Sequence, residues 1–346
     1  MRNKILASRI HVLASVVVFT MWVWGADNFS TSLNGDPRST LGAILHGTAH
    51  RPFVERMLVP ILTRGVYALA DEERWNDLSR FLLKIPKIQE ETTRLGWETQ
   101  YLPEYIIALG LALGSLIGFA FVFERFYSSL YETYDVVTNA LPTLAVLCLP
   151  PFFDVGTHYI YDFPSLLLFT MGLLLMQKRK WTLFYPVFII GCLNKETMVI
   201  LLVGFVLLFY QRMSRRKMLL HVAAQLGIFA IVKGLAMYQY GANPGSSLEF
   251  HLYRNIHFLL LPYNVVTLIV GAVIIGLTVY DIKEKHILLR KMAWLIVPFA
   301  ALMVVFGLVN EVRALYELFP IYFLLIAHTV LFSFLKLPFK LKLATE

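Results

Sequence analysis

The first residues that could carry chemistry lie near the N-terminus and combine acids with arginines. Asp36 follows an Asn-Gly pair and precedes Pro37, a composition typical of a turn. Arg51 and Arg56 follow it, and Asp27 lies just past the first apolar run as a second acid. A carboxylate on a loop suits a general base, and arginines suit an anion. The alternative interpretation is a solvated turn with arginines at lipid head groups.

A second polar group lies at the start of an apolar segment in the middle of the chain. His158 and Asp162 are four residues apart, so on a helix they would share one face. A zinc site would need further ligands at defined spacing, which the sequence does not supply. We therefore predict no metal site here. We expect a hydrogen-bonded pair at a helix start, with substrate binding as the functional interpretation.

The third polar group joins an interrupted apolar segment to a loop near the C-terminus. Asn194, Lys195 and Glu196 interrupt the stretch 181–210, and the later loop has the three charged residues Glu311, Arg313 and Glu317. Lys and Arg suit a phosphate or pyrophosphate, whereas the acids suit a general base or a divalent cation held with the phosphate. An ion-pair network that ties the two segments together is the alternative.

The composition indicates which elements must position these residues. Hydrophobic residues make up 58% of the chain and charged residues 16%, against ~45–50% and ~25% in soluble proteins. This predicts an integral membrane protein. The net charge of +8 does not indicate a nucleic-acid partner, because basic residues in cytoplasmic loops give the same total. No nucleotide-binding glycine motif or hydrolase motif is present, and Cys148 and Cys192 lie in apolar runs without metal-ligand spacing.

The apolar runs predict an all-α, polytopic bundle of about ten transmembrane helices in a single membrane domain, residues 1–346. One long helix over 181–210 would bury Asn194, Lys195 and Glu196 in hydrocarbon, so this stretch is divided in two. The predicted spans are 10–25, 104–123, 136–150, 159–176, 181–193, 197–210, 218–238, 263–280, 292–309 and 318–335.

The distribution of basic residues predicts the orientation of these spans. Most Lys and Arg fall at the two termini and in 177–180, 211–217 and 281–291, which places both termini and these loops in the cytoplasm. Residues 26–103 then form a long external loop. Within it, 57–70 contains Pro60 and Arg64 and suits an amphipathic helix lying in the interface, and 71–100 suits another surface helix interrupted by a proline.

Four short motifs resemble poorly characterised bacterial members of the GT-C superfamily of membrane glycosyltransferases. They are 51–60 (RPFVERMLVP), 161–164 (YDFP), 193–197 (LNKET) and 311–320 (EVRALYELFP), together with a long first external loop that carries an acid. The resemblance implies a multi-pass protein of the bacterial inner membrane that transfers a sugar from a polyprenyl-phosphate-linked donor to an envelope acceptor on the outer face. The partners it implies are this donor, the acceptor and membrane lipid, and no nucleic acid.

The resemblance also implies roles for the polar residues. Asp36 would be the general base with Asp27 as its substitute, and Arg56, Lys195 and Arg313 would hold the phosphate. The remaining candidate substrate-binding residues are His158, Asp162, Asn194, Glu196, Glu311 and Glu317. The paired acids usual in the first loop are not adjacent here. The cofactor is unknown, and a divalent cation stays open.

Three other classes of protein compete with this hypothesis. A transporter or flippase would place polar residues near the bilayer midplane and show symmetric halves, whereas this sequence has no internal repeat. A polymerase of lipid-linked sugars would share the same face and carrier. A non-catalytic membrane scaffold is the last alternative.

Overall fold

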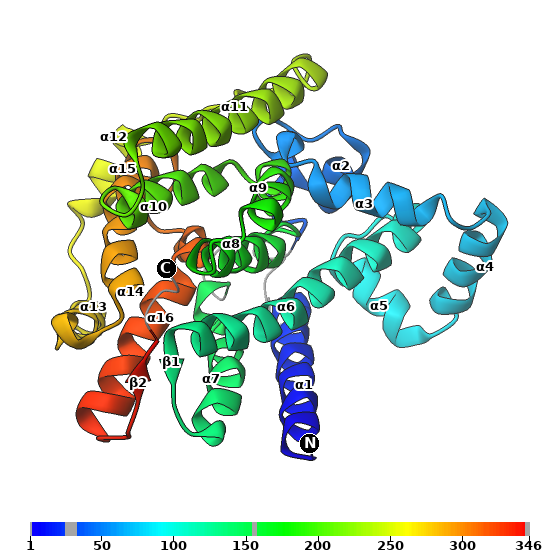
Figure 1. The fold of residues 1–346 in the computed structure, drawn as a ribbon. Coiled ribbons are helices and arrows are strands. Elements are labelled where there is room, and N and C mark those ends of the chain that lie inside the picture. The colour runs from blue at the N-terminus through cyan, green and yellow to red at the C-terminus, as the bar shows by residue number, and fades with distance from the viewer. Residues whose placement is uncertain (1, 25–32, 154–157, 343–346) are drawn as a thin grey trace.

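Helices form nearly all of the regular structure. The computed structural model describes residues 2–24, 33–153 and 158–342. Within these ranges the strands are β1 (Tyr131–Glu132) and β2 (Lys340–Leu341), an antiparallel pair that joins the C-terminal segment to the middle of the chain (Figure 1). The all-α class predicted from the sequence is therefore confirmed.

In the described part of the chain, five helical segments are long and apolar enough to cross a membrane. They lie in α1 (Arg2–Trp24), η4 (Thr99–Tyr101) with α6 (Leu102–Leu130), α7 (Asp135–Leu147) with η5 (Pro150–Phe152), α11 (Arg215–Gln239), and the segment Ile287–Phe306. Shorter apolar helices accompany them: α8 (Asp162–Gln177), α9 (Trp181–Asn194), η6 (Glu196–Val199) with α10 (Ile200–Phe209), α13 (Val265–Val279), and α16 (Phe319–His328) with η10 (Thr329–Phe334). A membrane character is thus supported by length and composition, and the count of ten spans stays a prediction.

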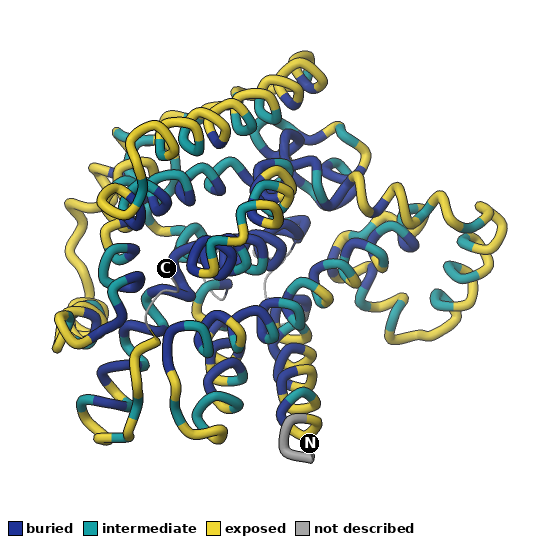
Figure 2. The backbone as a smooth tube through the Cα atoms, in the orientation of Figure 1, coloured by how far each residue is buried: buried dark blue, intermediate teal, exposed yellow. Residues whose placement is uncertain are grey.

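The core forms around α6 and α8, which pack against each other along their lengths. Ala108 and Ala112 on α6 are fully buried, and such small residues allow close helix approach. Gly172 on α8 likewise allows α10 to approach closely, since a Cβ there would lie 2.5 Å from a methyl of Leu201. Figure 2 shows α8 buried over most of its length, whereas α11 and α13 expose most of theirs. Because α11 is both apolar and exposed, it suits contact with lipid.

The stretch 181–210 is divided at the polar residues. Helix α9 ends at Asn194, Lys195 adopts an extended backbone (φ −160°, ψ 140°), and the chain resumes as η6 and then α10. The break removes Asn194, Lys195 and Glu196 from a continuous apolar helix, and it places them at one end of two short helices.

The long first loop is mostly helical. Its elements are η2 (Pro37–Ser39), α2 (Leu41–His46), η3 (Phe53–Glu55), α3 (Leu58–Tyr67), α4 (Glu72–Leu83), α5 (Pro86–Arg94) and η4 (Thr99–Tyr101). Ten residues of α3 span ~15 Å, about half of the hydrocarbon thickness. The region 71–100 holds two helices, because Pro86 begins the second, and both project from the body in Figure 1.

Several predicted boundaries differ from the structure. The predicted span 104–123 ends at the first charged pair, but α6 continues to Leu130. The predicted span 292–309 is a composite of α14 (Ile287–Met292), η8 (Ala293–Leu295) and α15 (Ile296–Phe306). The elements that were not predicted include α2, the strands β1 and β2, η7 (Ile282–Glu284), η9 (Val312–Glu317) and α12 (Leu252–Leu259). Asn255 of α12 donates hydrogen bonds to the carbonyls of Met303 and Val304 at the end of α15.

Candidate functional site

Four segments that are far apart in sequence meet at one end of the helices. A stack of side chains joins them: the Arg313 guanidinium lies 4.2 Å from the Tyr159 ring centroid, and Tyr159 stacks on Tyr161 at 5.1 Å and 7°. Arg56 completes the stack 4.3 Å from the Tyr161 centroid. Two arginines thus enclose two tyrosines, an arrangement stabilised by the attraction of cations to aromatic faces. The 194–196 break joins this stack through Glu196.

Arg56 and Glu196 form the first ion pair of the site. Arg56 Nη2 lies 2.6 Å from Glu196 Oε1, and the same guanidinium donates to the Tyr161 hydroxyl. Burial raises the pKa of Glu196, but the charge and hydrogen bonds of Arg56 outweigh it and lower this pKa to about 2. Burial likewise lowers the pKa of Arg56, and Glu196 and Tyr161 together raise it above its usual value. Both groups are therefore charged at neutral pH.

Lys195 and Glu317 form a second ion pair, which is more deeply buried. Lys195 Nζ lies 2.9 Å from Glu317 Oε1, and the two side chains are 7% and 1% exposed. The Thr197 hydroxyl donates to the same carboxylate oxygen. This pair connects the helix break to η9, as one interpretation of the sequence required.

Arg313 connects η9 to the start of α8. Its Nη2 donates to Glu311 Oε2 at 2.5 Å, and its Nη1 lies 3.6 Å from Asp162 Oδ1. Asp162 is fully buried and accepts from the Tyr159 amide at 2.9 Å. Asn194 fixes the same helix start from the other side, since its amide donates to the Tyr161 carbonyl at 3.0 Å and to the Ser165 hydroxyl.

The predicted pairing of His158 with Asp162 is wrong. Helix α8 begins at Asp162, so His158 precedes the helix and does not share a face with this acid. Its ring packs on Trp22 of α1 at 4.9 Å instead. Burial lowers the pKa of His158 to about 3, which keeps it neutral. Among the described residues His158 makes an aromatic contact in the core and no hydrogen bond to Asp162.

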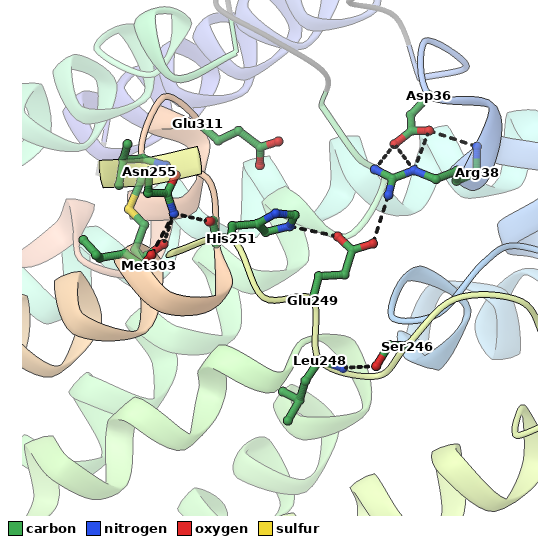
Figure 3. A network of polar contacts seen from close by, with 12 residues as sticks. Asp36, Arg38, Ser246, Leu248, Glu249, His251, Asn255, Met303 and Glu311 are labelled. Carbon is green, nitrogen blue, oxygen red and sulfur yellow. Dashed lines mark hydrogen bonds and ion pairs between the residues drawn. The ribbon is translucent and has the colours of Figure 1, made fainter. Parts of the chain in front are cut away.

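Asp36 lies on the more exposed side of the same end. Figure 3 shows it joined through Arg38 to Glu249 and His251, with Glu311 extending toward the same space. Arg38 donates to both Asp36 oxygens and, at 2.9 Å, to Glu249 Oε1. Partial burial raises the pKa of Asp36, but the hydrogen bonds and charge of Arg38 outweigh it and lower the pKa. Asp36 therefore presents an oriented, ionised carboxylate.

The first loop contacts the buried stack through two residues other than Asp36. Ser39 donates to the Tyr159 hydroxyl at 3.4 Å, and Phe53 stacks on the Tyr159 ring at 5.3 Å. The loop that carries Asp36 thus reaches the same tyrosine that Arg313 contacts. Asp27 lies outside the described residues, so its position relative to this site stays a prediction.

A further ion pair at this site, between Glu55 and Lys233, was not predicted from the sequence. Glu55, whose side chain is 1% exposed, accepts from Lys233 of α11 and from the Ser247 hydroxyl. Lys233 lies in the middle of the apolar run 218–238, and a lone cation in such a run marks a functional candidate by itself. The signal was therefore present in the sequence.

A narrow pocket opens beside these pairs. Its polar wall is formed by Glu55, Arg56, Lys195, Glu196 and Lys233, and its apolar wall by Cys192 and by Phe229, Val232 and Ala236 of α11. Three cations thus face apolar side chains of α11, a helix that is exposed over most of its length. Two acids share the pocket with them, so its formal charge is close to neutral.

Buried polar atoms gather at the same end. Among the buried side-chain atoms that lack a hydrogen-bond partner within the described ranges, six belong to the residues of this site: Asp162 Oδ1, Asn194 Oδ1, Lys195 Nζ, Arg313 Nε, Tyr316 Oη and Glu317 Oε2. Since most buried polar groups in proteins are hydrogen-bonded, these atoms are where a polar ligand or water would find partners. The described residues contain no group of three or more His, Cys, Asp or Glu side chains that could hold a metal ion. The arrangement therefore suits the binding of a polar or anionic group by fixed side chains.

Comparison with known proteins identifies no relative. No family model matches the chain, and no curated protein and no solved structure is significantly similar to it.

Proposed function

We propose that this protein is a membrane glycosyltransferase that moves a sugar from a polyprenyl-phosphate-linked donor to an acceptor outside the cytoplasm. One observation carries the proposal: four distant segments meet in a single polar site, where an oriented carboxylate and three cations lie at the same end of apolar helices. Residues that merely end transmembrane helices would spread around the rim instead. A transporter would place such residues nearer the middle of the bundle.

The chain's own residues can divide the reaction between them. Asp36 accepts the proton of the acceptor hydroxyl as that oxygen bonds to the anomeric carbon of the sugar. The bond from this carbon to the phosphate oxygen breaks, and the electron pair leaves with the phosphate. Arg56, Lys195 and Lys233 supply fixed positive charge where that anion develops. The phosphate competes there with Glu55, Glu196 and Glu317 for the same donors.

The apolar wall of the pocket favours a lipid-linked donor over a soluble sugar nucleotide. Phe229, Val232 and Ala236 lie on α11, which is apolar and mostly exposed. An isoprenoid chain beside this helix keeps its tail in lipid while its phosphate reaches Lys233. Lys233 is the most accessible of the three cations, with 21% of its side chain exposed.

The decisive experiment identifies which polyprenyl-linked sugar accumulates when the protein is removed. Wild-type protein should clear the intermediate, whereas Asp36→Asn, which keeps size but removes the base, should slow transfer by ~10²–10⁴-fold. Asp77→Asn is the matched control, since Asp77 lies on the exposed helix α4. Its ion-pair partner among the described residues is Arg80 of the same helix. Accumulation of no intermediate, or full activity of both Asp36→Asn and Asp27→Asn, would remove the transferase hypothesis and favour a transporter.

The proposal includes an orientation in a bacterial cytoplasmic membrane, with both termini in the cytoplasm and the site outside. In a variant without Cys148 and Cys192, a cysteine replacing Glu311 should react with an impermeant thiol reagent added outside. A cysteine replacing Lys178 should react only after the membrane is opened. The reverse labelling pattern would place the site in the cytoplasm and contradict the proposed acceptor.

A further inference from the structure

The opposite end of the helices carries a second pocket, with a different charge balance. It is lined by the C-terminal halves of α6 and α8 and by the segment after β2, through Glu124, Arg125, Ser128, Ser129, Gln177, Lys178 and Lys342. Its cavity volume is about 380 Å³. This is within the range of about 300–1,000 Å³ found for ligand sites. Its lining residues are absent from the ion-pair site described above.

The cations of this pocket are not neutralised by neighbouring acids. Arg125, Lys178 and Lys342 make no ion pair among the described residues, and the one acid in the lining, Glu124, lies 3.7 Å from His11 instead. Formal charges thus leave an excess of two positive charges around the pocket. In the ion-pair site, by contrast, each buried cation has a carboxylate partner.

Lys342 is held in place by its main chain. Its amide donates to the Leu130 carbonyl at 2.9 Å, and its carbonyl lies 2.9 Å from His286 Nε2. The pairing of β2 with β1 continues this attachment, and Lys342 Nζ donates to the Ser128 carbonyl at 2.8 Å. These contacts hold Lys342 at the pocket and give the pocket a preorganised cation.

Gln177 supplies a further polar group on the wall. It is the last residue of α8 and only 6% exposed, yet it lines the pocket together with the two serines of α6. If these basic residues only set the orientation of the membrane helices, they would not need to surround a pocket that also contains a buried amide. A favourable helix dipole explains Lys178 after α8, but it does not explain why a strand brings Lys342 to the same place.

We propose that this pocket binds a phosphate-bearing anion, such as the head group of an anionic membrane lipid. Three cations from separate elements, the Ser128 hydroxyl and an amide match a phosphate group in charge and hydrogen bonding, whereas the Ser129 hydroxyl already donates to the Phe126 carbonyl. A pocket at the end of membrane-crossing helices lies at the depth of lipid head groups, where basic pockets bind such lipids. The proposal does not depend on the glycosyltransferase hypothesis.

The test uses the full-length protein in nanodiscs of phosphatidylcholine with increasing phosphatidylglycerol, and measures bound lipid by native mass spectrometry. The triple variant Arg125→Gln, Lys178→Gln and Lys342→Gln should bind phosphatidylglycerol about 100-fold more weakly, at about a fivefold loss per cation. The matched control removes the same charges outside the pocket: Arg216→Gln, Lys217→Gln and Lys336→Gln. It should bind like the wild type.

The outcomes separate the sources of the phosphate. Displacement of the lipid by inorganic phosphate means that the pocket recognises the phosphate alone, and retention means that it recognises the whole head group. Equal losses in the two triple variants would mean general surface attraction and would overturn the proposal, as would unchanged binding in the pocket variant. If the triple variant does not fold, the exposed single variant Lys178→Gln should still lose about fivefold, and no loss overturns the proposal.

Discussion

Breaking the buried pair of Lys195 and Glu317 separates a structural role from a catalytic one. At 2.9 Å and an effective dielectric of ~20, the direct attraction is about 6 kcal/mol. Desolvation offsets much of this attraction in the intact pair. Lys195→Met leaves Glu317, which is 1% exposed, with only the Thr197 hydroxyl as a partner. We expect a loss of about 3–5 kcal/mol in the free energy of unfolding, the usual cost of an uncompensated buried charge.

The double variant Lys195→Met with Glu317→Leu distinguishes a structural role of Lys195 from a catalytic one. Replacing both charges by apolar side chains is often neutral, so its stability should return to within about 1 kcal/mol of the wild type. If the pair acts only as a structural link, transfer of the sugar recovers together with stability. If Lys195 stabilises the departing phosphate, the stable double variant stays inactive and the lipid-linked intermediate accumulates.

The assay is unfolding of the purified protein in mixed micelles, combined with the accumulation of intermediate in cells that express each variant. Asp77 and Arg80 provide the control, because they lie 2.6 Å apart but are more than half exposed. Arg80→Met should cost less than about 1 kcal/mol. If Lys195→Met loses as little unfolding free energy as Arg80→Met, the argument that burial makes the pair of Lys195 and Glu317 costly to break is refuted.

Two further predictions concern stability. Because Arg56 depresses the pKa of Glu196 from 4.5 to about 2, this pair stabilises the fold above pH about 4.5, and its contribution is lost as the pH falls toward 2. The melting temperature of the purified protein should fall as the pH falls through that window. Glu196→Gln should be less stable at neutral pH, and its melting temperature should depend less on pH. An unchanged dependence of melting temperature on pH in this variant would contradict the prediction. Gly245 has φ +88°, and a Cβ there would lie 2.7 Å from the Arg51 carbonyl oxygen. Gly245→Ala should therefore lose about 1–3 kcal/mol, measured by denaturation, whereas Gly276→Ala in open space on α13 should not.

The sequence predicts some features of the site because they follow from the cost of burying charge. Asn194, Lys195 and Glu196 interrupt an apolar run, and a continuous helix would bury all three in hydrocarbon, so a break was predictable. The glycosyltransferase hypothesis in addition requires the first loop, 158–162, 194–196 and 310–317 to meet at one cavity. The structure brings these segments together through Arg56, Lys195 and Arg313.

Other features depend on tertiary contacts that spacing alone does not reveal. His158 and Asp162 have helical spacing, but the helix begins one turn later, because Asp162 accepts the Tyr159 amide at its start. Lys233 was assigned to a membrane helix because its neighbours are apolar, and its partner Glu55 lies 178 residues away. Helix α6 continues beyond the charged residues at 124–125, because long charged side chains near the end of a helix can extend to water without ending the helix.

The attachment of the first loop to the end of α11 has a consequence for how the protein is made. The Arg51 amide donates to the Pro244 carbonyl, and Asn243 donates to the carbonyls of Gly47 and Ala49, across more than 190 residues of chain. At a synthesis rate of roughly 5–20 residues per second, these partners emerge about 10–40 s after the loop. During that interval the loop has neither its hydrogen bonds nor the lysine that pairs with Glu55. In an unfinished chain the carbonyls of Gly47 and Ala49 and the carboxylate of Glu55 therefore lack these partners until the segment that ends at Pro244 has been made.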